Sequence, residues 1–211
     1  MTPKTANLSA AVRHLKKVDP VLARVIEKVG PCKYVFYRDM PPFDAIISSI
    51  IYQQISGKAA QTILGRFQAI YGGKYPTPEA LLATPDDQLR SAGLSRQKIG
   101  YLRDLAQKAS SGEVPFDQLD ELEDDAIIDA LVKVKGVGRW TAQMFLMFRL
   151  GRPDVLAEAD LGIQNAIRRA YRMRARPVPI KVKKLGARWA PYRTIACWYL
   201  WRSIDGTAGR A

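Results

Sequence analysis

Signals for the start of a helix recur at short intervals along this chain, and they constrain its fold more than any other feature. A capping side chain or a proline suited to a first helical turn stands at Asp19-Pro20, Pro42, Thr77-Pro78, Thr84-Pro85, Ser95 and Pro191. Between these signals apolar residues recur every three or four positions, as at Ile46, Ile47, Ile50, Ile51 and Ile55. Only Tyr34–Tyr37 has the pattern of a strand, and one strand cannot form a sheet. We therefore predict an all-α protein.

The net charge of the chain indicates what kind of partner it binds. Its 211 residues suffice for one domain, or one domain of two joined lobes, and carry a formal charge of +13. Such a charge favours nucleic acid or an anionic membrane surface. No apolar run approaches a membrane span, and the N-terminus lacks the apolar core of a secretory signal. We expect a cytoplasmic protein, nucleoid-associated if bacterial, that binds no membrane.

The cysteine and histidine content limits metal chemistry. Cys32 and Cys197 are the only cysteines, and His14 is the only histidine. Two thiols are too few for a disulfide framework, a thiolate zinc site or a four-cysteine iron–sulfur cluster. We expect no metal centre built from Cys and His side chains and no cofactor. The cysteines fit small core positions, and His14 fits the surface.

Charges are unevenly distributed along the chain. Residues 113–129 hold eight acids and no base, a pattern typical of a solvated face. By contrast, the 44 residues Leu161–Ile204, here called the basic segment, hold 11 Lys or Arg and no acid. Most of these bases are predicted to contact phosphates non-specifically, but Arg193 lies within an aromatic motif and is left out of that set.

A glycine turn between two predicted helices suggests how the chain grips its partner. Residues 125–134 have helical apolar spacing, and a second helix begins at Arg139 after Lys135-Gly136-Val137-Gly138. The glycines permit positive φ and bring backbone N–H groups close to a ligand. At a helix N-terminus such groups favour a phosphate, so this hairpin is predicted to bind a DNA backbone without reading sequence. A hairpin whose glycines merely turn the chain fits the same pattern.

Five blocks of the chain, taken in order, carry a family resemblance. They are Ile51–Ser56, Gly93–Lys98, Val137–Ala142, Arg152–Val155 with Asp160-Leu161-Gly162, and Trp189–Thr194 with Trp201. Together they resemble the helix-hairpin-helix (HhH-GPD) DNA glycosylase superfamily, and more narrowly its 3-methyladenine, or alkylated-base, glycosylase II branch. The resemblance implies a two-lobed helical glycosylase fold without the N-terminal sheet domain of some longer members. The expected single domain, 1–211, has one lobe at 43–130 and another at 1–42 plus 131–211, with the hairpin at 131–142.

The resemblance also implies a catalytic group. Asp160 matches the family's catalytic aspartate, and a carboxylate there can stabilise the positive charge that builds on the sugar as an N-glycosidic bond breaks. From the residues alone a helix N-cap is the favoured role of Asp160, and the surrounding motif favours catalysis instead; the two roles are compatible. Where the glycosylase/lyase branch has a nucleophilic lysine, this chain has Trp140. The resemblance therefore implies a monofunctional enzyme whose nucleophile is water.

Further site residues follow from the same resemblance. Trp140 is expected to line the pocket for a flipped base, because its electron-rich face suits a cationic alkylated purine. Weaker pocket candidates are Met144, Trp189 and Tyr192, whereas Trp198 and Trp201 are expected in the core. Gln53 or Gln54 is the expected wedge that fills the gap left by the flipped base. The expected backbone contacts are Lys135, Gly136, Val137, Gly138, Arg139 and Thr141.

The predicted function is that of a monomeric, monofunctional DNA glycosylase. It would flip alkylated purines of the 3-methyladenine type out of double-stranded DNA and leave an abasic site. Two alternatives remain open: a glycosylase for deaminated or oxidised bases, since one fold supports several functions, and a non-catalytic helix-hairpin-helix DNA-binding module. A binding module has no need for both Asp160 and Trp140.

Overall fold

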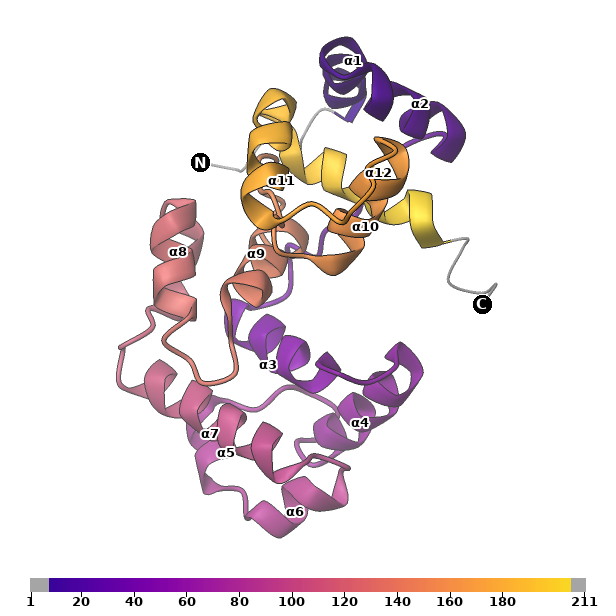
Figure 1. Ribbon diagram of the computed structural model, residues 1–211. Helices are drawn as coiled ribbons and strands as arrows, with labels where there is room; N and C mark the ends of the chain where they lie inside the picture. Colours follow the sequence, from indigo (N-terminus) through magenta and orange to yellow (C-terminus); the bar gives the residue numbers. More distant parts are fainter. Residues whose placement is uncertain (1–7, 206–211) are drawn as a thin grey trace. The chain divides into compact units, whose positions relative to one another are not determined.

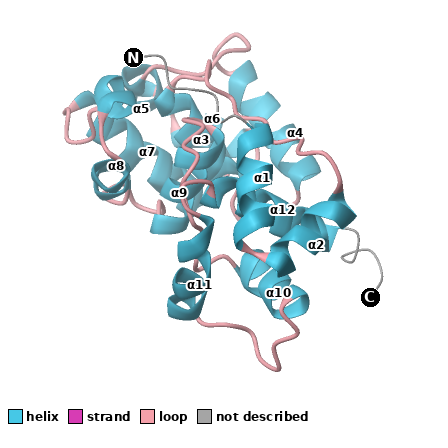
Figure 2. Cartoon of the chain, turned by 90° about the horizontal axis from the view of Figure 1, so that it is seen from above, coloured by secondary structure: helices cyan, strands magenta, loops and turns pink. Residues whose placement is uncertain are grey.

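The computed structural model describes residues 8–205, and these residues form helices and loops without a strand, as predicted (Figures 1 and 2). The strand-like segment Tyr34–Tyr37 is a loop. It is tied to the end of helix α9 (Arg139–Phe148), where the N–H of Tyr37 donates to the carbonyl of Phe148 at 2.7 Å and the Tyr34 hydroxyl donates to the carbonyl of Met147. With no second strand to pair with, its backbone takes helix-end carbonyls as partners instead.

The described chain divides into two compact units. The terminal unit comprises residues 8–38 and 146–205 and contains α1 (Leu8–Val18), α2 (Pro20–Val29), α10 (Leu161–Ala170), α11 (Pro179–Gly186), η2 (Ala187–Trp189) and α12 (Arg193–Asp205). The central unit, Asp39–Phe145, contains α3 (Pro42–Tyr52), α4 (Gly57–Ala69), α5 (Pro78–Ala83), α6 (Asp86–Ser91), α7 (Arg96–Ser110), η1 (Phe116–Glu121) and α8 (Asp124–Leu131). Helix α9 begins in the central unit and ends in the terminal unit.

This division differs from the predicted lobes in one respect that matters for the site. The hairpin at 131–142 was expected to belong with the two ends of the chain, but it lies in the central unit. The reason is tertiary, because side chains of α7 hold the hairpin, for example Lys108, whose ammonium donates to the carbonyl of Lys133 at 2.5 Å.

Helix α3 forms the centre of the central unit. The side chains of Ile46, Ile47, Ile50 and Ile51 are fully buried, and α3 packs on α4, α7 and η1. Ile55 departs from the predicted stripe, because α3 ends at Tyr52 and leaves Ile55 38% exposed. Local capping follows the sequence: Thr77 and Ser95 each accept the N–H three residues ahead at 3.2 Å, so α5 and α7 begin where predicted.

Helix α12 forms the centre of the terminal unit. Its residues Thr194–Leu200 are all buried, and it packs on α1, α2 and α10. A helix that is buried on every side has no polar face to show, which explains why it follows no amphipathic pattern. Among the described residues, no helix is both long and apolar enough to span a membrane, and no cluster of three or more His, Cys, Asp or Glu could hold a metal ion.

Asp19 is more than the helix cap that the sequence predicts. It is 1% exposed, and its Oδ1 accepts the N–H groups of Val21 and Leu22, both at 3.0 Å. Its Oδ2 accepts the Tyr171 hydroxyl at 2.5 Å and the Trp189 indole N–H at 2.9 Å. Burial raises the pKa of this carboxyl, but the hydrogen bonds outweigh burial and leave the pKa below its ordinary value. Asp19 thus ties α2 to the segments after α10 and α11.

Candidate functional site

Helix α7 supports the glycine hairpin along one side. The Tyr101 ring lies against Gly136 so closely that a Cβ there would be 2.2 Å from its Cδ2 atom. One turn further on, Asp104 Oδ2 accepts the backbone N–H of Lys135 at 2.8 Å. Gly136 has φ +79°, whereas Gly138 has no positive φ and open space where a Cβ would stand. Only the first glycine is therefore required by the turn itself.

These contacts reduce the number of hairpin N–H groups that can bind a DNA phosphate. The N–H of Lys135 is bound by Asp104, and the N–H of Val137 donates to the carbonyl of Val134 at 3.0 Å, so both are satisfied inside the protein. The glycine N–H groups at 136 and 138 have no hydrogen-bond partner among the described residues. Val137 is 4% exposed, so its side chain is a core anchor of the hairpin.

The flanking residues predicted to contact DNA differ in exposure. The side chain of Lys135 is 75% exposed, although its ammonium lies 3.6 Å from Asp104. Arg139 is half exposed and lies 3.9 Å from Asp125, at the limit of an ion pair. Thr141 is only 6% exposed. The two basic side chains can therefore reach a phosphate, while Thr141 faces inward.

The predicted wedge glutamines follow the end of α3, in a turn of residues 53–56 that we call the wedge turn. The Gln53 side-chain amide donates to the carbonyl of Gly136 at 2.8 Å. Gln54 is exposed and has φ +58°, a left-handed conformation that side chains other than glycine seldom adopt. The Lys98 ammonium donates to the carbonyls of Ile51 at 2.6 Å and Gln53 at 2.9 Å. The sequence marked the block Gly93–Lys98 without assigning this contact.

The wedge turn, the hairpin and Trp140 meet at one cavity inside the central unit. It has a volume of about 560 Å³, and its walls include Gln53, Gln54, Lys98, Tyr101, Gly136 and Trp140. Trp140 is 46% exposed, which is high for so large an apolar ring. The structure thus joins three groups that the sequence proposed separately. Met144, one turn further along α9, is half-buried and does not line this cavity.

Asp160 is held by two donors on one oxygen. Its Oδ1 accepts the N–H of Ile163 at 2.8 Å, which makes it the N-cap of α10, and the Trp201 indole N–H at 2.9 Å. The capping role is therefore confirmed. A Cβ on Gly162 would lie 3.0 Å from this oxygen and 3.1 Å from the Trp201 ring, so the glycine allows Trp201 to approach. Trp201 was expected only to fill the core, but it orients the carboxylate.

The C-terminal aromatic residues do not act as a group. Trp189 is fully buried, with its indole N–H bound to Asp19, which favours a role as a core anchor. Its place in a base pocket stays a prediction. Tyr192 is half-buried and packs edge-on against His14, with ring centroids 5.4 Å apart. His14 is likewise half-buried rather than a surface residue. Burial of an indole with a satisfied N–H is typical of a structural role.

The basic segment is largely exposed. Nine of its eleven bases precede Arg193, and all nine are exposed: Arg168, Arg169, Arg172, Arg174, Arg176, Lys181, Lys183, Lys184 and Arg188. Among them, Lys183 also pairs with Glu158 at 3.1 Å. Arg193 instead forms a two-pronged pair with Asp154, at 2.7 and 2.8 Å. Its exclusion from the phosphate-contacting set therefore has a structural reason, because a forked pair of this kind holds the guanidinium in place.

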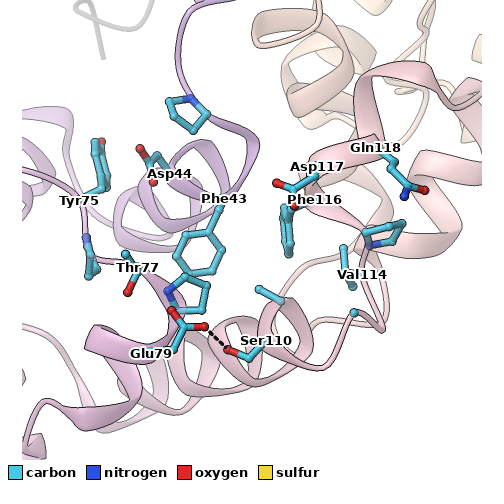
Figure 3. Close-up of a pocket in the computed structure, with 16 residues that line it drawn as sticks. Phe43, Asp44, Tyr75, Thr77, Glu79, Ser110, Val114, Phe116, Asp117 and Gln118 are labelled. Atoms are coloured by element: carbon cyan, nitrogen blue, oxygen red, sulfur yellow. Dashed lines mark hydrogen bonds between the residues drawn. The ribbon is translucent and has the colours of Figure 1, made fainter.

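A larger cavity, of about 710 Å³, lies at the opposite end of α3 (Figure 3). Phe43 and Phe116 meet edge-on in its wall at 5.6 Å between centroids, and Ser110 donates to Glu79 at 3.0 Å. Burial raises the pKa of Asp44 there to about 6. The cavity borders the first residues of α3, whereas the wedge turn follows the last. None of the predicted site residues lines it, so size alone does not identify the site.

Comparison with known proteins identifies relatives over most of the chain. Residues 47–191 match the family described as "HhH-GPD superfamily base excision DNA repair protein". The chain is 30% identical over 202 residues to an alkylbase DNA glycosidase-like protein of Schizosaccharomyces pombe, covering 94% of this chain and 95% of the relative. It is 35% identical to DNA-3-methyladenine glycosylase 1 of the same yeast, covering 93% and 88%.

A solved structure agrees with this assignment. The 3-methyladenine DNA glycosylase of S. pombe, in complex with abasic DNA, superposes on this chain with a TM-score of 0.82 at 35% identity. The match covers 93% of this chain and 97% of the other. The fold and the sequence therefore point to the same group of proteins.

Proposed function

The chain belongs to the HhH-GPD superfamily of base excision DNA repair proteins, and we infer that it is a monofunctional DNA glycosylase that removes alkylated bases. The observation that carries this inference is that the chain has both a fixed carboxylate, Asp160, and a tryptophan at position 140, where lyase chemistry would need an amine. The two residues assign the chemistry to hydrolysis of the N-glycosidic bond. Its product is an abasic site.

Asp160 is the residue we assign to catalysis. As the bond between base and sugar breaks, positive charge develops on the sugar, and a carboxylate stabilises that charge. The Ile163 N–H and the Trp201 indole N–H meet the same oxygen of Asp160, Oδ1, and help to fix the direction of the carboxyl group before substrate binds. A group held in advance has no reorganisation to make during the reaction, which is how preorganised electrostatics lowers a barrier.

Trp140 supplies the aromatic surface for the flipped base. Its exposed ring borders the 560 Å³ cavity, beside the wedge turn and the hairpin. An alkylated purine such as 3-methyladenine carries positive charge, which the face of an indole attracts. Stacking on this ring also offsets part of the cost of unstacking the base from the duplex. We propose that purines of this type are the substrate.

DNA is the partner of this protein, and we propose double-stranded DNA with a damaged base as the specific form. The Gly136 and Gly138 N–H groups and the side chains of Lys135 and Arg139 support backbone contact at the hairpin. The exposed basic segment adds non-specific attraction. We further propose that the protein acts as a monomer; light scattering with and without a DNA duplex tests this.

The experiment that tests the function is base release from defined DNA. Duplex DNA treated with a methylating agent is incubated with the protein, and the released bases are separated by chromatography. We expect 3-methyladenine among the products and intact strands until alkali is added. Release of deaminated or oxidised bases alone, from matched oligonucleotides, would reassign the substrate, and strand scission without alkali would contradict the monofunctional assignment.

A further inference from the structure

We propose that Lys98 is a positioning residue for base flipping, which holds the wedge turn against the hairpin so that Gln54 enters the duplex. This inference rests on the proposed function, because a wedge is needed only by a protein that flips a base. It gives Lys98, the last residue of the block Gly93–Lys98, a role beyond lining the cavity that Trp140 borders. Lys98 acts through the backbone of the wedge turn and is not a catalytic residue.

Lys98 binds backbone carbonyls at the C-terminal end of α3. The last carbonyls of a helix have no partner within it and carry the negative end of the helix dipole. The half-buried Lys98 ammonium satisfies two of the carbonyls at this end, those of Ile51 and Gln53, at 2.6 and 2.9 Å. One cation therefore stops α3 and fixes the direction in which the chain leaves it.

The two glutamines of the wedge turn, either of which was expected as the wedge, differ in their surroundings. The Gln53 amide donates to the carbonyl of Gly136 at 2.8 Å and so links the wedge turn to the hairpin. Gln54, the next residue, is exposed and held at φ +58°. A strained conformation of this kind persists only where the surroundings enforce it. The bonds made by Lys98 and Gln53 on the preceding residues are what enforce it, and they leave Gln54 as the inserted side chain.

Helix α7 holds both loops that face the cavity, the wedge turn and the hairpin. Lys98, Tyr101, Asp104 and Lys108 follow one another along α7 at helical spacing. Lys98 binds the wedge turn, Tyr101 packs on Gly136, and Asp104 binds Lys135. Pushing Gln54 into a duplex meets the resistance of stacked bases, and a turn that could yield would transmit that force poorly. Helix α7 supplies the rigid support, and Lys98 is its contact with the wedge turn.

The test compares affinity for two duplexes that differ at one position. One contains a tetrahydrofuran abasic-site analogue, which leaves a gap for the wedge, and the other is undamaged. We expect Lys98→Met to weaken binding of the abasic duplex about tenfold while binding of the undamaged duplex changes less than about twofold. Lys98→Arg, which can still donate to carbonyls, should retain most of the preference. The matched control is Lys74→Met, which removes the same charge from an exposed loop of the central unit.

A double variant shows whether Lys98 acts through the wedge. Gln54→Ala should lose the same preference for the abasic duplex as Lys98→Met. The variant that carries both changes should bind the abasic duplex no more weakly than Gln54→Ala alone, because the effects of two residues that act together do not add. Losses that add would overturn the proposal. So would equal weakening on both duplexes, which would mean that Lys98 contributes only charge, as would an unchanged preference in Lys98→Met.

Two measurements keep the proposal separate from its premises. Thermal unfolding is followed for each variant, and if Lys98→Met does not fold, Gln53→Met, which breaks the link to Gly136, is assayed in its place with the same expected loss. Binding does not require base release, so a wild-type protein that prefers the abasic duplex but releases no alkylated base would overturn the proposed function and leave the positioning role standing. A wild-type protein with no preference for the abasic duplex would overturn the positioning role.

Discussion

Replacing Asp160 separates its structural role from its chemical one. Its Oδ1 accepts hydrogen bonds from the Ile163 N–H at 2.8 Å and the Trp201 indole N–H at 2.9 Å. In Asp160→Asn, an amide oxygen can occupy that position and accept both bonds while the negative charge is lost. Because Asn and Asp cap helices about equally well, the free energy of unfolding should change by less than about 0.5 kcal/mol.

Asp160→Ala is the contrasting variant. It loses the cap, which is worth about 0.5–2 kcal/mol, and leaves the half-buried Trp201 indole without this acceptor. We therefore expect a fall of roughly 1–3 kcal/mol in the free energy of unfolding, measured by urea titration. The difference between the two variants should measure the structural contribution of Oδ1.

The chemical role appears in the rate of base release. Loss of a preorganised electrostatic partner typically slows a reaction by about 10²–10³-fold, or about 2.7–4 kcal/mol of activation free energy. We expect Asp160→Asn to show a loss of at least this size in single-turnover release of 3-methyladenine from methylated duplex DNA. Its affinity for abasic DNA should be retained. Release by the Asn variant within about threefold of wild type would refute the catalytic assignment, because a factor that small is less than one charge contributes.

Three further substitutions test the surrounding structure. Gly136 has φ +79°, and a Cβ there would lie 2.2 Å from Tyr101, so Gly136→Ala should lower the free energy of unfolding by about 1–3 kcal/mol. Gly138 has open space around it, so Gly138→Ala should lower the free energy of unfolding by less than about 1 kcal/mol. Equal losses for the two variants in urea titration would contradict this difference. Asp44 has its pKa raised to about 6 by burial, so the folded state prefers the protonated form and wild-type stability should fall as pH rises from about 4 to 6, by on the order of 1 kcal/mol. Asp44→Asn should remove that fall, and parallel stability curves for the two proteins would refute it. Trp189→Phe removes one donor to buried Asp19 and should cost about 1–3 kcal/mol of stability without changing base release per folded molecule, and a changed lesion preference would restore Trp189 to the pocket.

The candidate site was predictable to the extent that it consists of residue types at fixed positions. Asp160, Trp140 and the glycine hairpin were predicted from the residues and from motifs whose order in the chain resembles the glycosylase family. Their environments could not: two of the hairpin N–H groups turned out to be used inside the protein, and Trp189 is buried where a pocket wall was expected. Trp201 was expected only in the core, yet its indole N–H donates to Asp160. The sequence could not show this contact, because a tryptophan in an apolar helix gives no sign of where its N–H points.

Local features of this protein follow from its sequence alone. A cap such as Ser95 bonds to an N–H three residues ahead, so it depends on no distant part of the chain, and the same is true of Asp160 as a cap. The all-α fold follows from the apolar spacing in the same way. Contacts over long sequence separations do not. Lys98 lies 47 residues from Ile51, and Gln53 lies 83 residues from Gly136, so their bonds depend on how α7 packs against α3 and the hairpin. Helical periodicity specifies which face of α7 is buried but not which elements pack on that face. The packing of α7 against α3 and the hairpin is what distinguishes Gln53 from Gln54 and Gly136 from Gly138.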